Sequence, residues 1–265
     1  MIKKVVILLA IAAVVFFGVR DLLAAPVGNP LKEPAKGDLM IGYEETLVQD
    51  QDLKHNDLSQ PHGYKSSQHL AKFTYGLLEG LTGNGEIGIG RIKNISLEIP
   101  HGNQIAWGGG FDWNIMRNLN SLWSRIPQTL PYDIEIGLSG RYIGIASDKD
   151  DQTPPRTPVV QYDENWKEFQ SAAWLARDFG VFSPYAALVV NWTQVRQKEE
   201  TGGVITTRTL KDPADVGYAL GCDVSFVKCQ KLSDVRFLKD INLSFEYRGG
   251  SESALTAGIN WIWKY

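Results

Sequence analysis

Charged side chains recur inside segments that alternate between apolar and polar residues, and they are the first candidates for chemistry in this sequence. Nine of them fall on the polar face of such segments: Lys72, Glu86, Asp112, Glu135, Arg141, Asp223, Glu246, Arg248 and Lys264. Charges of both signs on one enclosed face can line a path for ions and small polar solutes, or they can pair across the enclosed space and close it. The sequence leaves both roles open.

Histidines are the second candidates, because an imidazole can act as a general base near neutral pH. All four fall in or at the edge of two predicted surface loops, close to three aspartates: His55, His62, His69, His101, Asp50, Asp52 and Asp57. A hydrolase that works by His and Asp above the rim of a barrel, as the omptin surface proteases do, is one alternative, although the sequence carries no omptin motif. We predict no catalytic residue and no enzyme activity.

The segment that contains Lys264 indicates how these charges are positioned. Apolar residues occupy every second position there: Leu255, Ala257, Ile259, Trp261, Trp263 and Tyr265. Such alternation is typical of a β-strand with a different solvent on each side. In the five clearest segments the apolar face carries no charged residue, whereas the other face is rich in Gly, Ala and Ser and carries seven charges. Small residues with a few opposed charges suit the interior of a narrow barrel whose outer face contacts lipid.

These segments predict an all-β protein, a closed antiparallel up-and-down transmembrane β-barrel of about ten strands. An even number of strands would place both termini on the periplasmic side. Aromatic residues near the strand ends suit the membrane–water interface: Trp107, Trp113, Trp192, Trp261, Trp263 and Tyr265. A soluble β-sandwich is the alternative, because its strands also have one apolar and one polar face. A multi-span helical membrane protein is excluded, since no run after the amino-terminus approaches roughly 18 apolar residues.

The connections follow from the strand count. We predict extracellular loops at residues 52–68, 92–102, 147–164, 198–213 and 250–252, and periplasmic turns at residues 78–80, 117–132, 180–184 and 229–240. The second periplasmic connection holds either a short surface helix or an irregular loop, because Leu119, Leu122, Trp123 and Ile126 have helical spacing. The phase of residues 166–178 is ambiguous. The glycines of residues 83–90 lie inside an alternating strand, where they relieve crowding rather than bind phosphate.

The amino-terminus predicts export. Lys3 and Lys4 precede an unbroken apolar run at residues 5–19, as in a secretory signal peptide. We expect a signal peptide at residues 1–24, a periplasmic lead at 25–37 and the barrel at 38–265; an uncleaved anchor is the alternative. Cys222 and Cys229 would lie about 23 Å apart along one strand, too far for a disulfide. We expect Cys222 to face lipid and Cys229 to lie in a turn, and we predict neither a metal site nor a cofactor.

Two segments resemble the chlamydial major outer-membrane porin family. The first is Pro26-Val27-Gly28-Asn29-Pro30, followed by a strand carrying Gly42-Tyr43; the second is Phe169-Gln170 followed by Phe182-Ser183-Pro184-Tyr185. The resemblance implies a porin-type barrel of the outer membrane, although this chain is shorter than that family and lacks its cysteines. A final strand that ends in Trp-Lys-Tyr is likewise similar to the terminal signature of bacterial outer-membrane barrels.

We therefore predict a narrow porin-like channel for ions or small polar solutes in the outer membrane of a Gram-negative envelope. The alternatives are a non-conducting structural or adhesive surface barrel and, less favoured, an omptin-like hydrolase. The expected partners are outer-membrane lipid, small solutes and the barrel-insertion machinery, which would recognise the carboxy-terminal strand ending at Tyr265. The formal net charge of −3 gives no basic surplus for nucleic acid. The oligomeric state stays open.

Overall fold

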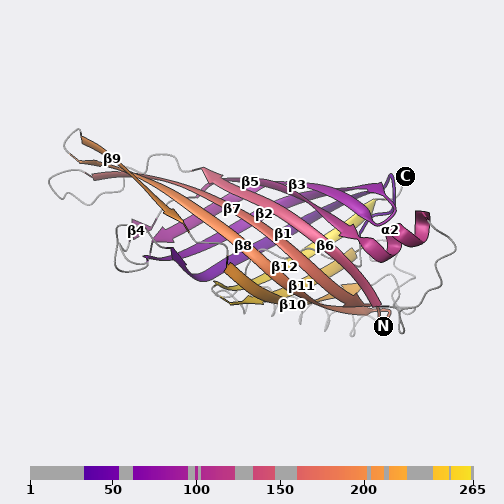
Figure 1. Ribbon diagram of the computed structural model, residues 1–265. Coiled ribbons are helices and arrows are strands. Elements are labelled where there is room, and N and C mark those ends of the chain that lie inside the picture. The colour runs from indigo at the N-terminus through magenta and orange to yellow at the C-terminus, as the bar shows by residue number, and fades with distance from the viewer. Residues whose placement is uncertain are drawn as a thin grey trace, which may run out of the picture.

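The structure is a computed structural model that describes residues 33–53, 62–94, 99–100, 103–122, 134–146, 160–201, 204–211, 215–225, 241–250 and 252–263. Figure 1 shows its elements. They are the strands β1 (Leu39–Leu53), β2 (His62–Leu78), β3 (Leu81–Asn94), β4 (Ile99–Pro100), β5 (Gln104–Asn114), β6 (Ile134–Ala146), β7 (Val160–Arg177), β8 (Phe182–Thr201), β9 (Val204–Lys211), β10 (Asp215–Ser225), β11 (Ile241–Gly249) and β12 (Glu252–Trp263), and the helix α2 (Ile115–Leu122).

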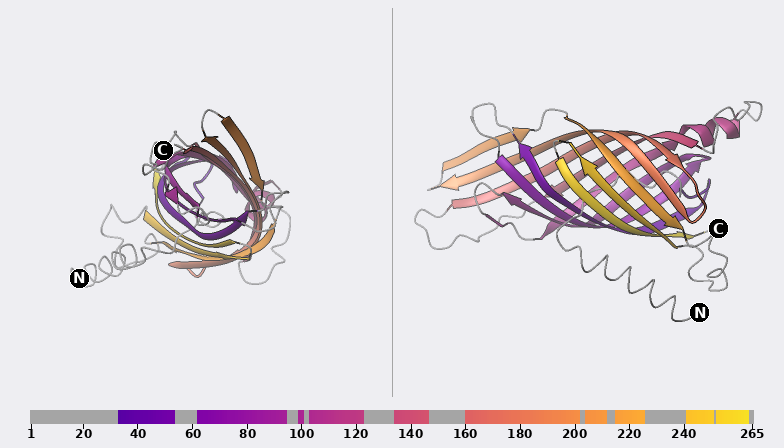
Figure 2. Two further views of the ribbon diagram at one scale, coloured as in Figure 1. Left: turned by 90° about the vertical axis from the view of Figure 1, so that its left-hand side faces the viewer. Right: turned by 90° about the horizontal axis from the view of Figure 1, so that it is seen from below.

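Ten of the strands form a closed antiparallel ring. Each strand pairs with the next in the order β1, β2, β3, β5, β6, β7, β8, β10, β11 and β12, and β12 pairs with β1 to close the circle. The ring is visible end on in Figure 2. The start of the first strand lies beside the end of the last, since Leu39 pairs with Trp263. The prediction of a closed up-and-down barrel of about ten strands is confirmed, whereas the side on which the termini lie stays a prediction.

Alternation along each strand sorts the side chains between the inside and the outside of the ring. In β5, for example, Gln104, Ala106, Asp112 and Asn114 are buried, while Ile105, Trp107 and Phe111 are exposed. Closure removes the free strand edges that an open sheet would present to its surroundings. A short turn joins β2 to β3, as predicted, and Gly80 adopts a φ of 75° there, which a residue with a side chain rarely does.

The distribution of polarity is the reverse of that in a soluble protein. Among the described residues, buried polar and charged side chains outnumber buried apolar ones, and many large apolar side chains are exposed on the outer wall. Leu188 is 68% exposed and Ile105 is 64% exposed, although water-soluble monomers rarely present large contiguous apolar surfaces. In the described part of the chain no helix has the length and apolarity needed to cross a membrane.

Three details of the sequence prediction are wrong. The predicted loop at residues 198–213 is largely a β-hairpin, because β8 continues to Thr201 and pairs with β9 beyond the ring (Figure 1). β1 and β2 extend into the predicted loop at residues 52–68, and β7 extends into the one at residues 147–164. The predicted connection at residues 117–132 starts two residues too late, because Ile115 already begins α2. The Asn114 side chain caps this helix by accepting a hydrogen bond from the Arg117 N–H at 3.0 Å.

Several predictions lie outside the described residues. They are the signal peptide at residues 1–24, most of the lead at 25–37, Trp123 and Ile126, Cys229, and the end of the chain with Lys264 and Tyr265. The helical alternative for residues 117–132 is supported for the part that is described, since α2 contains Leu119 and Leu122. Cys222 is a free thiol and is half-buried.

Candidate functional site

A network of buried charges lies near the middle of the lumen. Arg141 on β6 donates hydrogen bonds to the Glu86 carboxylate on β3, from Nη2 at 2.6 Å and from Nε at 3.0 Å, and from Nη2 to the Glu44 carboxylate on β1 at 2.5 Å. Lys72 on β2 lies between the two carboxylates, with its Nζ 3.6 Å from Glu86 and 4.0 Å from Glu44. The four side chains are almost fully buried.

This network crosses the lumen rather than following one wall. β1 and β6 stand four places apart in a ring of ten, so the bond from Arg141 to Glu44 joins nearly opposite sides. Glu44, Lys72 and Asp112 also line a cavity of about 20 Å³, which is enough for a single water molecule. Among the described residues, the network therefore spans the lumen at this level, and the cavity beside it is too small for a hydrated ion.

A second group of polar contacts lies on the other wall. Arg248 on β11 donates a hydrogen bond from Nη1 to Gln170 on β7 at 2.6 Å, and its Nη1 lies 3.7 Å from the Glu168 carboxylate. The Tyr185 hydroxyl on β8 donates a hydrogen bond to Glu246 on β11 at 2.5 Å. The contact between Arg248 and Gln170 spans three places of the ring, and the one between Tyr185 and Glu246 spans two. This group therefore also narrows the lumen.

The mouth beside the strand ends Leu39 and Trp263 contains a third set of charges. Asn114 hydrogen-bonds to Glu135, which forms an ion pair with Arg117 of α2 at 3.3 Å. Glu33, just before β1, is buried, and neither of its carboxylate oxygens has a hydrogen-bond partner among the described residues. Burial raises the pKa of Glu33 well above its usual range. The carboxylates of Asp112 and Glu135 raise it further, whereas Arg117 lowers it.

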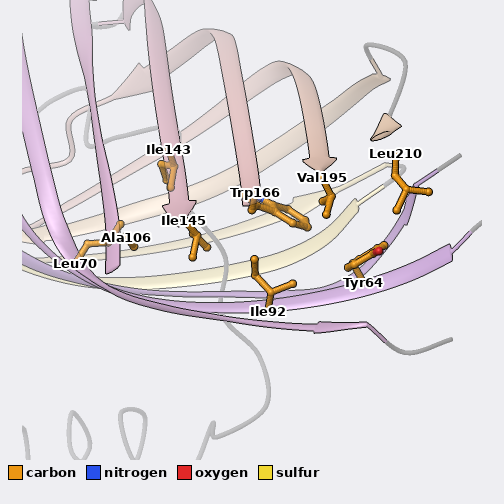
Figure 3. Close-up of a cluster of buried hydrophobic side chains, with 9 residues drawn as sticks. All are labelled: Tyr64, Leu70, Ile92, Ala106, Ile143, Ile145, Trp166, Val195 and Leu210. Atoms are coloured by element: carbon orange, nitrogen blue, oxygen red, sulfur yellow. The ribbon is translucent and has the colours of Figure 1, made fainter. Parts of the chain in front are cut away.

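Apolar and aromatic side chains close the opposite mouth. Tyr64 on β2 packs edge-on against Trp166 on β7, with ring centroids 6.2 Å apart, and its hydroxyl accepts a hydrogen bond from Gln197 on β8 at 2.7 Å. β2 and β8 stand five places apart in the ring, so this contact spans the full width of the mouth. Figure 3 shows the cluster that surrounds it: Tyr64, Leu70, Ile92, Ala106, Ile143, Ile145, Trp166, Val195 and Leu210. Closure at this end is therefore mainly apolar.

The predicted lumen residues fall into three groups. Those buried inside the ring are Lys72, Glu86, Asp112, Arg141, Asp223, Glu246 and Arg248. Glu135 is half-buried at the mouth, in the contact with Arg117 already described. Lys264 lies outside the described residues. The structure brings Lys72, Glu86 and Arg141 into one network, while Glu246 and Arg248 lie in the second group of polar contacts.

The predicted interfacial aromatics lie on the outer wall where they are described. Trp107, Trp261 and Trp263 are about half exposed, and Trp113 and Trp192 are partly exposed. Neighbouring aromatic residues also contact one another, since Trp107 lies 5.4 Å from Tyr142 and Trp261 lies 5.6 Å from Trp263, measured between ring centroids. Tyr265 lies outside the described residues.

Sequence reasoning missed several members of the lumen network. Glu44 was available from the alternation of β1, because it shares a face with Gly42, opposite the face of Ile41 and Tyr43. Glu168 and Gln170 were missed because the phase of β7 was ambiguous. Tyr185 was considered only as part of the segment Phe182-Ser183-Pro184-Tyr185, yet it is buried and faces the lumen.

The histidines considered as candidates for a general base are only partly described by the structure. His69, predicted at the edge of a loop, lies well inside β2 on the outer face, where its Nδ1 is 2.8 Å from the Tyr43 hydroxyl and 3.9 Å from Glu45. His55 and His101 lie outside the described residues. In the described part of the chain no group of three His, Cys, Asp or Glu residues has the geometry to hold a metal ion.

Comparison with known proteins adds three structural likenesses. No protein-family model and no curated protein sequence matches the chain. It is similar to the translocator domain of autotransporter NalP from Neisseria meningitidis (TM-score 0.42, 11% identity, 89% of this chain and 91% of that one). It is also similar to an outer membrane channel from Pseudomonas putida F1, with a TM-score of 0.40 and 9% identity over 90% of this chain and 100% of that one. A third similar structure is OprG from Pseudomonas aeruginosa, with a TM-score of 0.39 and 8% identity over 88% of this chain and 99% of that one. Likenesses this low identify neither a family nor an activity, and the chlamydial resemblance stays a prediction.

Proposed function

We propose that this protein is an outer-membrane β-barrel with a narrow, constricted lumen that passes small cations when the bridge formed by Arg141 is broken. The observation that carries the proposal is the position of this bridge. It joins β6 to β1 and β3 across the interior of a closed ring, within a network of buried carboxylates.

The membrane location is supported by the inverted distribution of polarity. A ring of ten strands with charges inside and exposed Leu, Ile, Phe and Trp outside suits a hydrocarbon solvent around its outer wall. A closed barrel satisfies the backbone hydrogen bonds of every strand without help from water, which is the condition for crossing a bilayer. The predicted export signal would bring the chain to the outer membrane.

The preference for cations follows from the balance of buried charge. Among the strand residues whose side chains are described, seven carboxylates are buried in the ring against three cations. The carboxylates are Glu44, Glu86, Asp112, Glu164, Glu168, Asp223 and Glu246, and the cations are Lys72, Arg141 and Arg248. Rings of carboxylates favour cations in membrane pores. Because the cations hold several of these carboxylates in ion pairs, the same charges that attract an ion also obstruct its path.

Single-channel recording in planar bilayers tests the proposal. We expect rare, small conductance steps from the parent protein and larger, more frequent steps from Arg141→Gln, with a reversal potential in a salt gradient that indicates cation selectivity. Arg208→Gln removes the same charge from an exposed position on β9 and serves as the control, which should behave like the parent. A folded barrel that conducts neither in its parent form nor as Arg141→Gln would refute the proposal that this bridge alone closes the lumen.

A non-conducting surface barrel is the second candidate, and the apolar mouth favours it. The contact between Tyr64 and Gln197, together with the surrounding cluster, narrows the lumen at the mouth, apart from the network formed by Arg141. The paired variant Tyr64→Ala with Arg141→Gln separates the two functions. Conductance that appears only in the paired variant would indicate a channel with two barriers, whereas silence in every variant would favour a structural or adhesive role.

A further inference from the structure

A row of aromatic side chains crosses adjacent strands on the outer wall. Tyr142 on β6 pairs with Phe169 on β7, which in turn pairs with Trp192 on β8. Trp107 on β5 packs against Tyr142 at the end of this row. Aromatic residues gather at the level where hydrocarbon meets the lipid headgroups. This row therefore marks the interface at the end of the barrel remote from Leu39 and Trp263.

Cations occupy the next positions beyond the aromatic row. Two residues further along the outer face of β7 stands Lys167, which is exposed and pairs with Gln194 on β8. Gln194 pairs on its other side with the exposed Lys211 of β9. Arg196 lies two residues beyond Gln194 on the same face of β8 and is also exposed. Three cations thus lie within neighbouring or diagonal cross-strand positions, where side chains reach one another.

The wall is hollowed at this place. Asn165, Lys167, Gln194 and Arg196 line an open hollow of about 300 Å³ on the outer face of β7 and β8. Two cationic groups and two amides supply hydrogen-bond donors around it, which is the chemistry that recognises a phosphate group. The hollow faces the surroundings of the barrel rather than its lumen, so it is separate from the site described above.

Exposed cations also lie beyond the apolar residues on a second part of the outer wall. On β2 and β3 the exposed Lys65 pairs with the exposed Lys93, and Ser67 pairs with Arg91. These positions lie beyond the apolar outer residues Phe73 and Ile89 of the same strands, as Lys167 lies beyond Phe169. Two separate groups of cations beside the apolar belt favour a partner that surrounds the barrel over a ligand held at one point.

We propose that the group formed by Lys167, Arg196 and Lys211 binds the phosphate of anionic lipid headgroups. The inference rests on the membrane location in the proposed function, although not on conductance. The aromatic row holds this wall at the interface, the hollow accepts the phosphate, and the amides of Asn165 and Gln194 donate hydrogen bonds to its oxygens. Each Lys or Arg near an anionic surface raises lipid affinity about fivefold.

Native mass spectrometry of the detergent-solubilised, full-length barrel provides the test. Phosphatidylglycerol is titrated against phosphatidylcholine with the same acyl chains, and inorganic phosphate is added in a separate arm. We expect the parent to prefer phosphatidylglycerol, and the double variant Lys167→Gln with Arg196→Gln to bind it about 30-fold more weakly. The control removes two exposed cations at other places, with Lys36→Gln and Arg208→Gln, and should bind like the parent.

Three results would overturn the inference: equal binding of the two lipids, unchanged binding by the double variant, or an equal loss in the control. Inorganic phosphate that competes at the same concentration as the lipid would show that the site takes free phosphate. Both variants change exposed side chains, and heat-modifiable migration confirms that each barrel is folded. Bilayer insertion without headgroup preference would remove this inference alone, whereas failure to insert would remove the membrane proposal as well.

Discussion

Replacing Arg141 by Gln should lower the stability of the barrel strongly. Arg141 is only 7% exposed, and its guanidinium donates three hydrogen bonds to Glu44 and Glu86. Without it, the two carboxylates keep only Lys72, at 4.0 Å and 3.6 Å, as a cationic partner in this network. Leaving a buried charge without its partner typically costs about 3–5 kcal/mol. We expect a loss of this size in the free energy of unfolding.

Urea unfolding of the reconstituted barrel, followed by tryptophan fluorescence, measures this loss. With an m-value of about 2 kcal/mol/M, the midpoint should fall by about 1.5–2.5 M. Arg117→Gln is the matched control, because Arg117 pairs with Glu135 at 3.3 Å but both side chains are more than a quarter exposed. An exposed pair contributes about 1 kcal/mol at most.

The difference between the urea midpoints of the two variants tests whether the Arg141 network is buried. Equal shifts for Arg141→Gln and Arg117→Gln would show that water reaches the lumen network as freely as the mouth, and would refute the buried constriction. Adding Glu86→Gln to Arg141→Gln should recover part of the loss, since one unpaired carboxylate is then removed. A double variant with fully additive losses would show that Arg141 acts by filling space rather than by its charge.

Two further variants test the packing of the wall and the charge at the mouth. Gly88→Ala should prevent folding to the heat-modifiable form, because the new Cβ would lie 1.8 Å from the backbone carbonyl oxygen of His69, while Gly85→Ala on the same strand meets no atom within 4 Å and should fold. Glu33, whose pKa is raised above its ordinary value of 4.5, should ionise unfavourably as the pH rises, so stability should fall above pH 4.5 in the parent and less in Glu33→Gln. A pH profile of the urea midpoint that is the same in both proteins would contradict this assignment.

The barrel was predictable because lipid outside and a polar interior make apolar and polar residues alternate along each strand. Where lipid covers one face and a confined polar space lies on the other, every second residue changes character, as in Ile241, Leu243 and Phe245 against Asn242 and Ser244. Beyond the apolar belt both faces of a strand contact water and the contrast disappears. The β8–β9 hairpin was therefore taken for a loop.

The partners inside the lumen were not predictable in the same way. Arg141 and Glu44 are 97 residues apart, and their contact depends on the diameter of the ring and on the stagger of its strands, which no single strand encodes. β7 adds a second difficulty. Trp166 and Trp174 are buried inside the ring, so large aromatic residues lie on the face that the other strands reserve for polar and small ones. The alternation of β7 therefore gave no clear phase.

Two glycines on the inner face of β5 explain how the Arg141 side chain reaches Glu86, and this feature of the site can be recognised from the sequence. β5 stands between β6 and β3, so the guanidinium must pass over the inner face of β5 to contact Glu86. At that level Gly110 pairs with Arg141 and Gly108 pairs with Glu86, so that face of β5 has no side chain in the way. Gly108 and Gly110 thus leave the space that a long cationic side chain fills. In a narrow barrel, glycines on the inner face of one strand therefore indicate that long charged side chains extend over it from its neighbours.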